Sequence, residues 1–222
     1  MLLLFDIDGT LLLKASVAHA AAVHAALAEV YGVGEPTAPV EAAGKTDLQI
    51  AREICVRAEV DAARFDAGLA DFRVATAEAY ARLCPADLSA HVSPGMGDVL
   101  DELRAREGVR LSLVTGNLEP VARLKLARAG LGHHFERGQG GFGSDEEDRS
   151  LLPAIARARA GGWPRERTVV IGDTPRDIAC ARADGVGVVA IATGPYPAAE
   201  LRDADHVVGS AAELLAVLGT QA

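Results

Sequence analysis

The first hydrophobic segment of the chain is a run of four apolar residues, 2–5, that ends at Asp6 and Asp8. Apolar residues without polar alternation are typical of a strand buried on both faces of a parallel sheet. Side chains two positions apart share a face of an extended chain, so Asp6 and Asp8 are expected to point the same way before Gly9 lets the backbone turn. The pattern predicts a buried strand that carries two carboxylates to the sheet edge where ligands bind in open α/β folds.

Residues 15–88 follow a helical pattern with no convincing strand. Ser16 is a candidate N-cap for a helix over 17–31, and further helices are predicted over 47–57 and 67–83, with a short turn between those two. A helical block directly after a first strand is typical of an insertion into an alternating core. We therefore predict a separate helical cap over residues 15–88.

Strands and helices alternate through the rest of the chain. Strands are predicted over 109–114, 168–171, 187–192 and 207–208, and helices over 97–106, 119–129, 150–160, 175–183 and 211–218. Such alternation indicates a doubly wound parallel sheet with right-handed crossovers. The predicted fold class is α/β: a Rossmann-like core of residues 1–14 and 89–222 with an inserted α-helical cap.

Composition and charge exclude several classes of protein. The chain has 222 residues, 50% hydrophobic but only 4% aromatic, and a net charge of -9, which argues against nucleic acid as a partner. Three cysteines without paired spacing, Cys55, Cys84 and Cys180, argue against a disulfide framework and fit a reduced cytoplasm. Asp6 and Asp8 interrupt the leucine-rich start, and no stretch reaches the ~20 apolar residues of a membrane span. We expect a soluble cytoplasmic protein without a membrane partner, as a monomer or homodimer.

Polar residues follow three of the predicted strands. They are Asp6 and Asp8, then Thr115-Gly116-Asn117, then Asp173 with Asp177 four residues later. Adjacent parallel strands lie ~4.8 Å apart, so these groups can converge on one small volume. Crowded carboxylates repel one another unless a hard cation lies between them, and an oxygen-only set favours Mg2+ over zinc. The threonine hydroxyl and the amides of the following turn can donate to a phosphate, so the combination indicates phosphoryl transfer.

These motifs resemble those of the haloacid dehalogenase superfamily, in its phosphatase branch with a helical cap. The resemblance covers essentially the whole chain. Its first motif matches at Asp6, Asp8, Gly9 and Thr10, its second at Thr115, and its fourth at Gly172, Asp173 and Asp177.

The resemblance implies a role for each acid. Asp6 would be the nucleophile that takes the phosphoryl group, and Asp8 the general acid for the leaving alcohol and then the base for water. Asp6, Asp8 and Asp173 would hold Mg2+, with Asp177 at the metal's edge or behind its direct ligands. The implied activity is Mg2+-dependent hydrolysis of a small phosphorylated metabolite through an aspartyl-phosphate, phosphoglycolate or a sugar phosphate being typical. Asp8 can act as an acid only if partly protonated, which we expect burial and like-charged neighbours to favour.

The basic residue of the family's third motif is less clear, because its usual Lys-Pro is absent. Arg149, before the strand that ends at Asp173, occupies the corresponding place and is the preferred candidate. Lys125 is the alternative, but it lies about seven residues into its helix, ~10 Å along the axis, and its reach is expected to be poor. In the cap, Lys45 stands at a loop-to-helix junction, where it could contact an anionic substrate.

Other functions stay open. Dehalogenases and phosphonate-cleaving members of the superfamily lack an acid at the position of Asp8, which argues against both. A β-phosphoglucomutase-like phosphoryl-transfer isomerase differs only in how the cap controls water, and a catalytically silent phosphate-binding regulator is the rival from another class. The glycine pattern of residues 138–143 is interpreted as a mobile loop rather than a dinucleotide site, because no strand precedes it and acidic residues follow. His133 and His134 follow a helix end, where metal binding is not expected.

Overall fold

A computed structural model describes residues 1–34 and 40–219; the part of the predicted cap at residues 35–39 lies outside them. The described residues form a six-stranded sheet in the order β3-β2-β1-β4-β5-β6, with every neighbouring pair parallel. The strands are β1 (Leu2–Phe5), β2 (Arg110–Thr115), β3 (Gly141–Phe142), β4 (Thr168–Gly172), β5 (Gly187–Ile191) and β6 (His206–Val208). This arrangement confirms the doubly wound parallel core.

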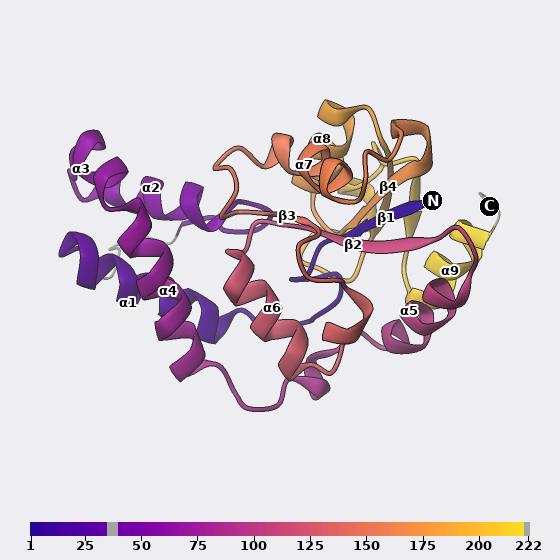
Figure 1. Ribbon diagram of the computed structural model, residues 1–222, viewed down its shortest axis with the longest axis horizontal. Helices are drawn as coiled ribbons and strands as arrows, with labels where there is room; N and C mark the ends of the chain where they lie inside the picture. The colour runs from indigo at the N-terminus through magenta and orange to yellow at the C-terminus, as the bar shows by residue number, and fades with distance from the viewer. Residues whose placement is uncertain (35–39, 220–222) are drawn as a thin grey trace.

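Helices cover both faces of the sheet, as the fully apolar β1 requires (Figure 1). Leu3 and Phe5 pack in one hydrophobic cluster with α5 (Met96–Ala105), α6 (Glu119–Arg128) and α9 (Ala211–Gly219). Leu2 and Leu4 point the other way, into a second cluster with α7 (Leu152–Arg159) and α8 (Pro175–Asp184). The alternation of side chains along a strand thus divides four consecutive leucine and phenylalanine residues between two cores.

The register of β1 brings three strand ends together. Phe5 is paired with Leu113 of β2 on one side and with Ile171 of β4 on the other. Asp6 therefore leaves the sheet beside the last residues of both neighbouring strands, and its amide donates to the carbonyl of Ile171 at 2.8 Å. This central position of β1 places its two acids between the polar residues that follow β2 and β4.

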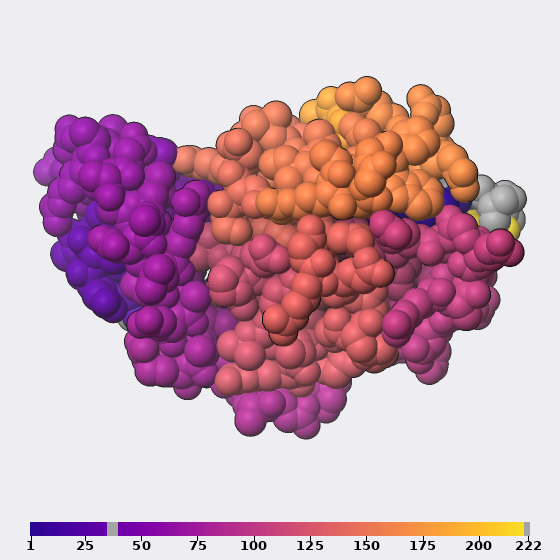
Figure 2. All heavy atoms as spheres, viewed as in Figure 1, coloured from indigo at the N-terminus to yellow at the C-terminus, as the bar shows by residue number. Residues whose placement is uncertain are grey.

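Four α-helices lie between β1 and α5 in the chain, and we call them the cap helices. They are α1 (Val17–Tyr31), α2 (Asp47–Arg57), α3 (Ala62–Ala67) and α4 (Leu69–Leu83). They make up one end of the molecule, beyond the sheet (Figures 1 and 2). Tyr31 connects α1 with α3. Its ring stacks on the ring of Phe65 with centroids 5.3 Å apart, and its hydroxyl donates to the carbonyl of Phe65 at 2.9 Å. The chain leaves the sheet region after Leu12 and returns to it at Val92, and these two residues pair in an isolated antiparallel β-bridge.

Two local predictions were wrong, and a third was confirmed in position only. Residues 141–142 form the edge strand β3 where a mobile loop was expected, since two residues are too few to show a period. The turn before α4 is the short helix α3, capped by the Asp61 side chain. Ser16 occupies the N-cap position of α1 but makes no capping bond with its side chain.

Short 3-10 helices lie at Ser89–His91, Gly132–His134, Arg149–Leu151, Arg165–Arg167 and Ala198–Glu200. Within residues 1–34 and 40–219, no helix combines the length and the apolar character that a bilayer crossing needs.

Candidate active site

Three buried carboxylates lie at the carboxyl edge of the sheet. Asp6, Asp173 and Asp177 each have a carboxylate oxygen within 4.8 Å of the other two. Thr10 donates to Oδ1 of Asp173 at 3.1 Å, while the buried Oδ2 of Asp173 has no hydrogen-bond partner among the described residues. The structure thus brings together the acids that follow β1 and β4.

Two glycines leave room around the unpaired Asp173 oxygen. A Cβ added at Gly9, which has a φ of +90°, would lie 2.1 Å from Oδ2 of Asp173, and one at Gly194 would lie 1.7 Å from it. Both positions therefore require the absence of a side chain. Gly9 belongs to the first motif, but no sequence signal marked Gly194.

Crowding and burial change the proton affinity of these acids. Burial raises the pKa of Asp6 to about 7, against the opposing charge of Arg149, with the charges of Asp177 and Asp8 raising it further. Burial also raises the pKa of Asp173 to about 8, and the charges of Asp6 and Asp177 add to this. A cation between the carboxylates would relieve that repulsion. An oxygen-only donor set with one free buried oxygen fits a hard divalent ion such as Mg2+.

Arg149 joins two of the three acids. Its Nη2 donates to Oδ1 of Asp6 at 3.0 Å and to Oδ1 of Asp177 at 2.5 Å, and the whole side chain is buried. The other oxygen of Asp177 accepts from the amide and the hydroxyl of Thr174 at 3.0 and 2.7 Å, in the capping box of α8. The Asp177 carboxylate is therefore occupied by protein donors, and it holds both Arg149 and the start of α8 in place.

Asp8 has a different cation. Lys125 is fully buried, and its Nζ donates to Oδ1 and Oδ2 of Asp8 at 2.8 and 2.6 Å. Asn117 also donates to Oδ2 of Asp8, at 2.9 Å. The expectation of poor reach for Lys125 was wrong, because helical side chains lean toward the N-terminus and this one runs through the interior. The two basic candidates thus hold different acids: Arg149 holds Asp6 and Lys125 holds Asp8.

The Lys125 ammonium reverses the expected protonation of Asp8. Burial alone would raise the pKa of the Asp8 carboxyl, but the charge of Lys125 and the hydrogen bonds from Lys125 and Asn117 hold it below its ordinary value. The prediction that burial and neighbouring acids favour a protonated Asp8 was therefore wrong for this arrangement, in which the ionised carboxylate is favoured.

Two residues of the cap helices continue this network. Nδ1 of His19 lies 3.1 Å from Nζ of Lys125, and its Nε2 lies 3.0 Å from Oδ2 of Asp47. An ammonium group can only donate, so Nδ1 accepts and the imidazole proton on Nε2 points to Asp47. Asp47 also accepts from the amide of Leu118 in the core at 2.8 Å. A continuous chain of hydrogen bonds therefore runs from Asp8 through Lys125 on α6 and His19 on α1 to Asp47 on α2. Sequence reasoning named Asp8 and Lys125 as candidates but missed His19 and Asp47, because neither belongs to a motif of the site.

The Thr115-Gly116-Asn117 turn, predicted to bind phosphate, also contacts the cap helices at the start of α2. The carbonyl of Gly116 accepts from the amide of Asp47 at 2.8 Å. A Cβ on Gly116 would lie 2.0 Å from the carbonyl oxygen of Lys45, so the glycine permits this close approach. Thr115 is buried, and its Oγ1 lies 3.4 Å from the amide of Asn117 that donates to it. Phosphate binding by these residues stays a prediction.

A cavity of about 720 Å³ opens over these groups, between the sheet edge and the cap helices. Asp6, Asp8, Asp173 and Arg149 line its floor. Lys45 lines its cap side, with its ammonium donating to Glu53 at 2.5 Å. The predicted nucleophile Asp6, the predicted acid Asp8 and the carboxylate of Asp173 therefore line one cavity, which is partly open to solvent.

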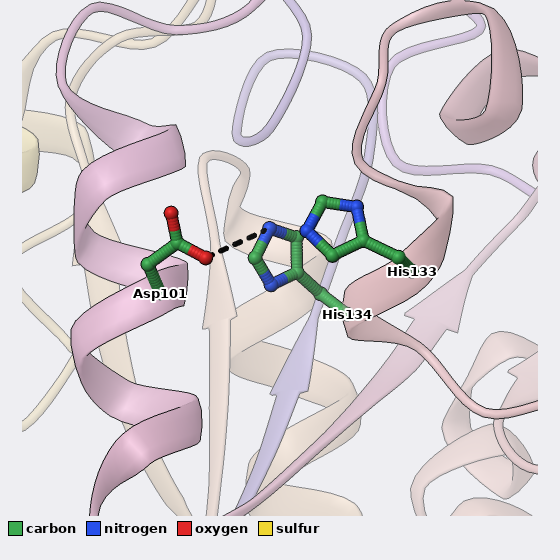
Figure 3. Close-up of side chains that lie close together, drawn as sticks. All are labelled: Asp101, His133 and His134. Atoms are coloured by element: carbon green, nitrogen blue, oxygen red, sulfur yellow. Dashed lines mark ion pairs between the residues drawn. The ribbon is translucent and has the colours of Figure 1, made fainter.

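A second cluster lies away from this cavity, on α5 and the turn after α6 (Figure 3). Nε2 of the buried His134 is 3.9 Å from Oδ1 of the exposed Asp101, and the His133 and His134 rings lie with their centroids 3.9 Å apart and their planes tilted by 39°. Burial lowers the pKa of His134, and the neighbouring His133 lowers it further. Each of the three side chains has a potential ligand atom within 4.8 Å of the other two. That the two histidines bind no metal stays a prediction.

Several known proteins are similar to this chain in sequence. The family model for haloacid dehalogenase-like hydrolases matches residues 3–182. A phosphoglycolate phosphatase of Cereibacter sphaeroides is 33% identical over 204 residues, which are 91% of this chain and 89% of that protein. A phosphoglycolate phosphatase of Chromobacterium violaceum is 34% identical over 123 residues, 55% of this chain and 54% of its own length. The tyrosine-protein kinase PtkA of Mycobacterium tuberculosis is 37% identical over 101 residues, 45% of this chain and 34% of its own. The matches to the last two relatives thus span about half or less of their lengths.

Solved structures share the fold. A protein from Clostridium acetobutylicum, described as a predicted phosphatase, superposes with a TM-score of 0.70 over 99% of this chain and 98% of its own. The two sequences are 17% identical, so this similarity supports the architecture alone.

Proposed function

The chain belongs to the haloacid dehalogenase-like hydrolases, and from this premise we propose that it hydrolyses phosphate monoesters with Asp6 as the nucleophile. The observation that carries the proposal is the position of Asp6. Its carboxylate lies on the cavity floor between Arg149 and the unpaired oxygen of Asp173. The relatives named phosphoglycolate phosphatase support this reaction class, and a small phosphorylated metabolite is the proposed substrate.

In the first proposed step, an oxygen of Asp6 attacks the phosphorus and the bond to the leaving alcohol breaks. Arg149 donates to Asp6 at 3.0 Å, so it orients the carboxylate and offsets negative charge as the aspartyl-phosphate forms. Mg2+ held by Asp6, the Asp8 carbonyl and Asp173, with Asp177 behind them, would reduce the repulsion between the carboxylate and the phosphate.

In the second proposed step, Asp8 accepts a proton from water, the water oxygen bonds to phosphorus, and the bond to Asp6 breaks. An ionised Asp8, held by Lys125, suits this step directly. For the first step the same group must carry a proton to the leaving oxygen. An anionic substrate raises the proton affinity of a nearby carboxylate, so we infer that Asp8 is protonated when substrate is bound.

Phosphate release from a panel of monoesters, with and without Mg2+, tests this function. We expect release that requires the metal, and the Asp6→Asn protein, measured in parallel, should give none above background. Absence of metal-dependent release across the panel would overturn the proposal and favour a phosphate-binding regulator. We also propose a cytoplasmic location, since Cys55, Cys84 and Cys180 are free and buried.

A further inference from the structure

The cavity continues from the catalytic acids into an apolar chamber between the first two cap helices. Its floor is polar, whereas α1 contributes Ala20 and Val23 and α2 contributes Ile50 and Ile54. Val23 and Ile54 are buried in the same hydrophobic cluster that holds the cap helices together, and Ile50 packs against that cluster. The chamber wall is therefore a fixed part of the fold.

The chamber is larger than a short leaving group needs. The whole cavity, catalytic floor included, has a volume of about 720 Å³, within the range of about 300–1,000 Å³ that is typical of sites for drug-sized ligands. A phosphoryl group with a two-carbon alcohol would leave most of this space to solvent against apolar walls.

The loop that leads into α2 is seated on the core beside the cavity. Thr46 donates from Oγ1 to the carbonyl of Glu147 at 2.8 Å, beside the contact between Asp47 and Gly116. Arg176 of α8 donates to the carbonyl of Ala43 in the same loop at 2.8 Å. These contacts hold the start of α2, and with it Ile50, over the catalytic acids.

The charged groups on the cap side do not favour a second acidic group on the substrate. The Lys45 ammonium is compensated by Glu53 at 2.5 Å, and His19 is engaged by Lys125 and Asp47. Lys14 and His24 are the further basic residues of the lining; Lys14 is exposed, and Nδ1 of His24 is buried without a hydrogen-bond partner among the described residues. Of the apolar lining, Val23 and Ile54 are almost fully buried, so the half-buried Ile50 and the exposed Ala20 present most of the surface for carbon atoms.

We propose that the enzyme prefers phosphate monoesters whose leaving alcohol carries an uncharged apolar chain or ring of about five or more carbons. This inference rests on the proposed phosphatase activity. It assigns the phosphoryl group to the polar floor and the apolar part of the alcohol to the surface made by α1 and α2. Burial of each methylene against that surface stabilises the bound ester.

A series of straight-chain alkyl phosphates tests the preference with the wild-type protein. Methyl, butyl and hexyl phosphate have leaving groups of similar basicity, so kcat/KM reports the fit of the chain. We expect kcat/KM to rise by about two- to fourfold per methylene, and at least about thirtyfold from methyl to hexyl. Phosphoglycolate and 6-phosphohexanoate, which carry a carboxylate, should be poorer substrates than hexyl phosphate.

Two variants locate the preference in the chamber. Ile50→Asn makes the wall polar, and Ala20→Phe fills the space from α1; each should lower the hexyl-to-methyl ratio of kcat/KM at least about fivefold. Val56→Asn is the matched control, since Val56 is 66% exposed on the same helix as Ile50, and it should leave the ratio unchanged. Thermal unfolding checks that each variant is folded, and the wild-type series decides the question if one variant is not.

The outcomes separate this inference from the function on which it rests. Phosphate release that is independent of chain length, or fastest with phosphoglycolate, would overturn the apolar preference and leave the phosphatase activity standing. No release from any ester, p-nitrophenyl phosphate included, would overturn both.

Discussion

Asp6 and Asp8 are two residues apart on one turn, yet their surroundings push their proton affinities in opposite directions. Asp6 lies among other buried carboxylates, and its pKa is raised to about 7 although Arg149 contacts it. Asp8 accepts two hydrogen bonds from a buried lysine and one from Asn117, and its pKa is lowered. The difference shows that the number of cations and anions around each carboxylate, rather than burial itself, decides its charge.

The two surroundings also differ in what lies behind them. The partners of Asp6 come from the core, after β4 and before α7. The direct partners of Asp8, Lys125 and Asn117, also lie in the core, but Lys125 continues the network into the cap helices at His19 and Asp47. Only the outer part of the Asp8 network therefore depends on the seating of the cap helices.

The largest expected effect comes from removing the nucleophile. Asp6→Asn should lower kcat by about four orders of magnitude or more, because an amide oxygen does not form the aspartyl-phosphate. Asp8→Asn should lower it by about two to three orders of magnitude, since it removes only the proton carrier. Steady-state phosphate release measures both, with circular dichroism to confirm folding. An Asp6→Asn protein that retained a few per cent of activity would show that Asp6 is not the nucleophile.

Removing the cation on Asp8 should have the next effect. In Lys125→Met the carboxylate loses its ammonium partner, so its pKa rises and kcat falls by about a hundredfold near neutral pH. The acidic limb of the kcat/KM profile should move to higher pH, and Lys125→Arg should restore part of the activity. An unchanged pH profile in a folded Lys125→Met protein would show that Lys125 does not set the pKa of Asp8.

Breaking the network at its cap end should have a smaller effect. His19→Gln or Asp47→Asn leaves Lys125 on Asp8 but loosens its orientation, so we expect kcat to fall by about threefold to tenfold. Asp61→Asn is the control, because Asp61 caps α3 outside this network and the substitution should not change kcat. Equal loss in the control and in the two test variants would indicate a general weakening of the cap helices.

The smallest expected effect is a pH-dependent stabilisation by metal. The raised pKa values of Asp6 and Asp173, about 7 and about 8 against an ordinary 3.8, mean that the folded metal-free protein binds more protons than the unfolded chain between these values. Its stability therefore falls as pH rises through that window, and Mg2+ must displace protons at pH 6 but not at pH 8.5. Millimolar Mg2+ should raise Tm by a few degrees more at pH 8.5 than at pH 6. Asp173→Asn should remove most of this difference.

The sequence determined the parts of the fold that rest on local pattern. The apolar run of β1, the strand ends at Thr115 and Asp173, and the alternation of helices and strands predicted the parallel sheet and the family. The two-residue strand β3 was not predicted because it is too short to show a hydrophobic period. The residues 15–88 predicted as a cap contain α1 to α4, which lie beyond the sheet.

The charge state of the site was decided by the tertiary structure. The reach of Lys125 was underestimated because its distance along the helix axis does not determine the path that its buried side chain takes to Asp8. His19 meets Lys125, and Asp47 meets His19 and the amide of Leu118, only because the tertiary structure brings the starts of α1 and α2 beside α6 and the residues after β2. A sequence can thus supply the acids of an active site, but their proton affinities depend on which cations the folded chain places within hydrogen-bond distance, since those interactions act through space.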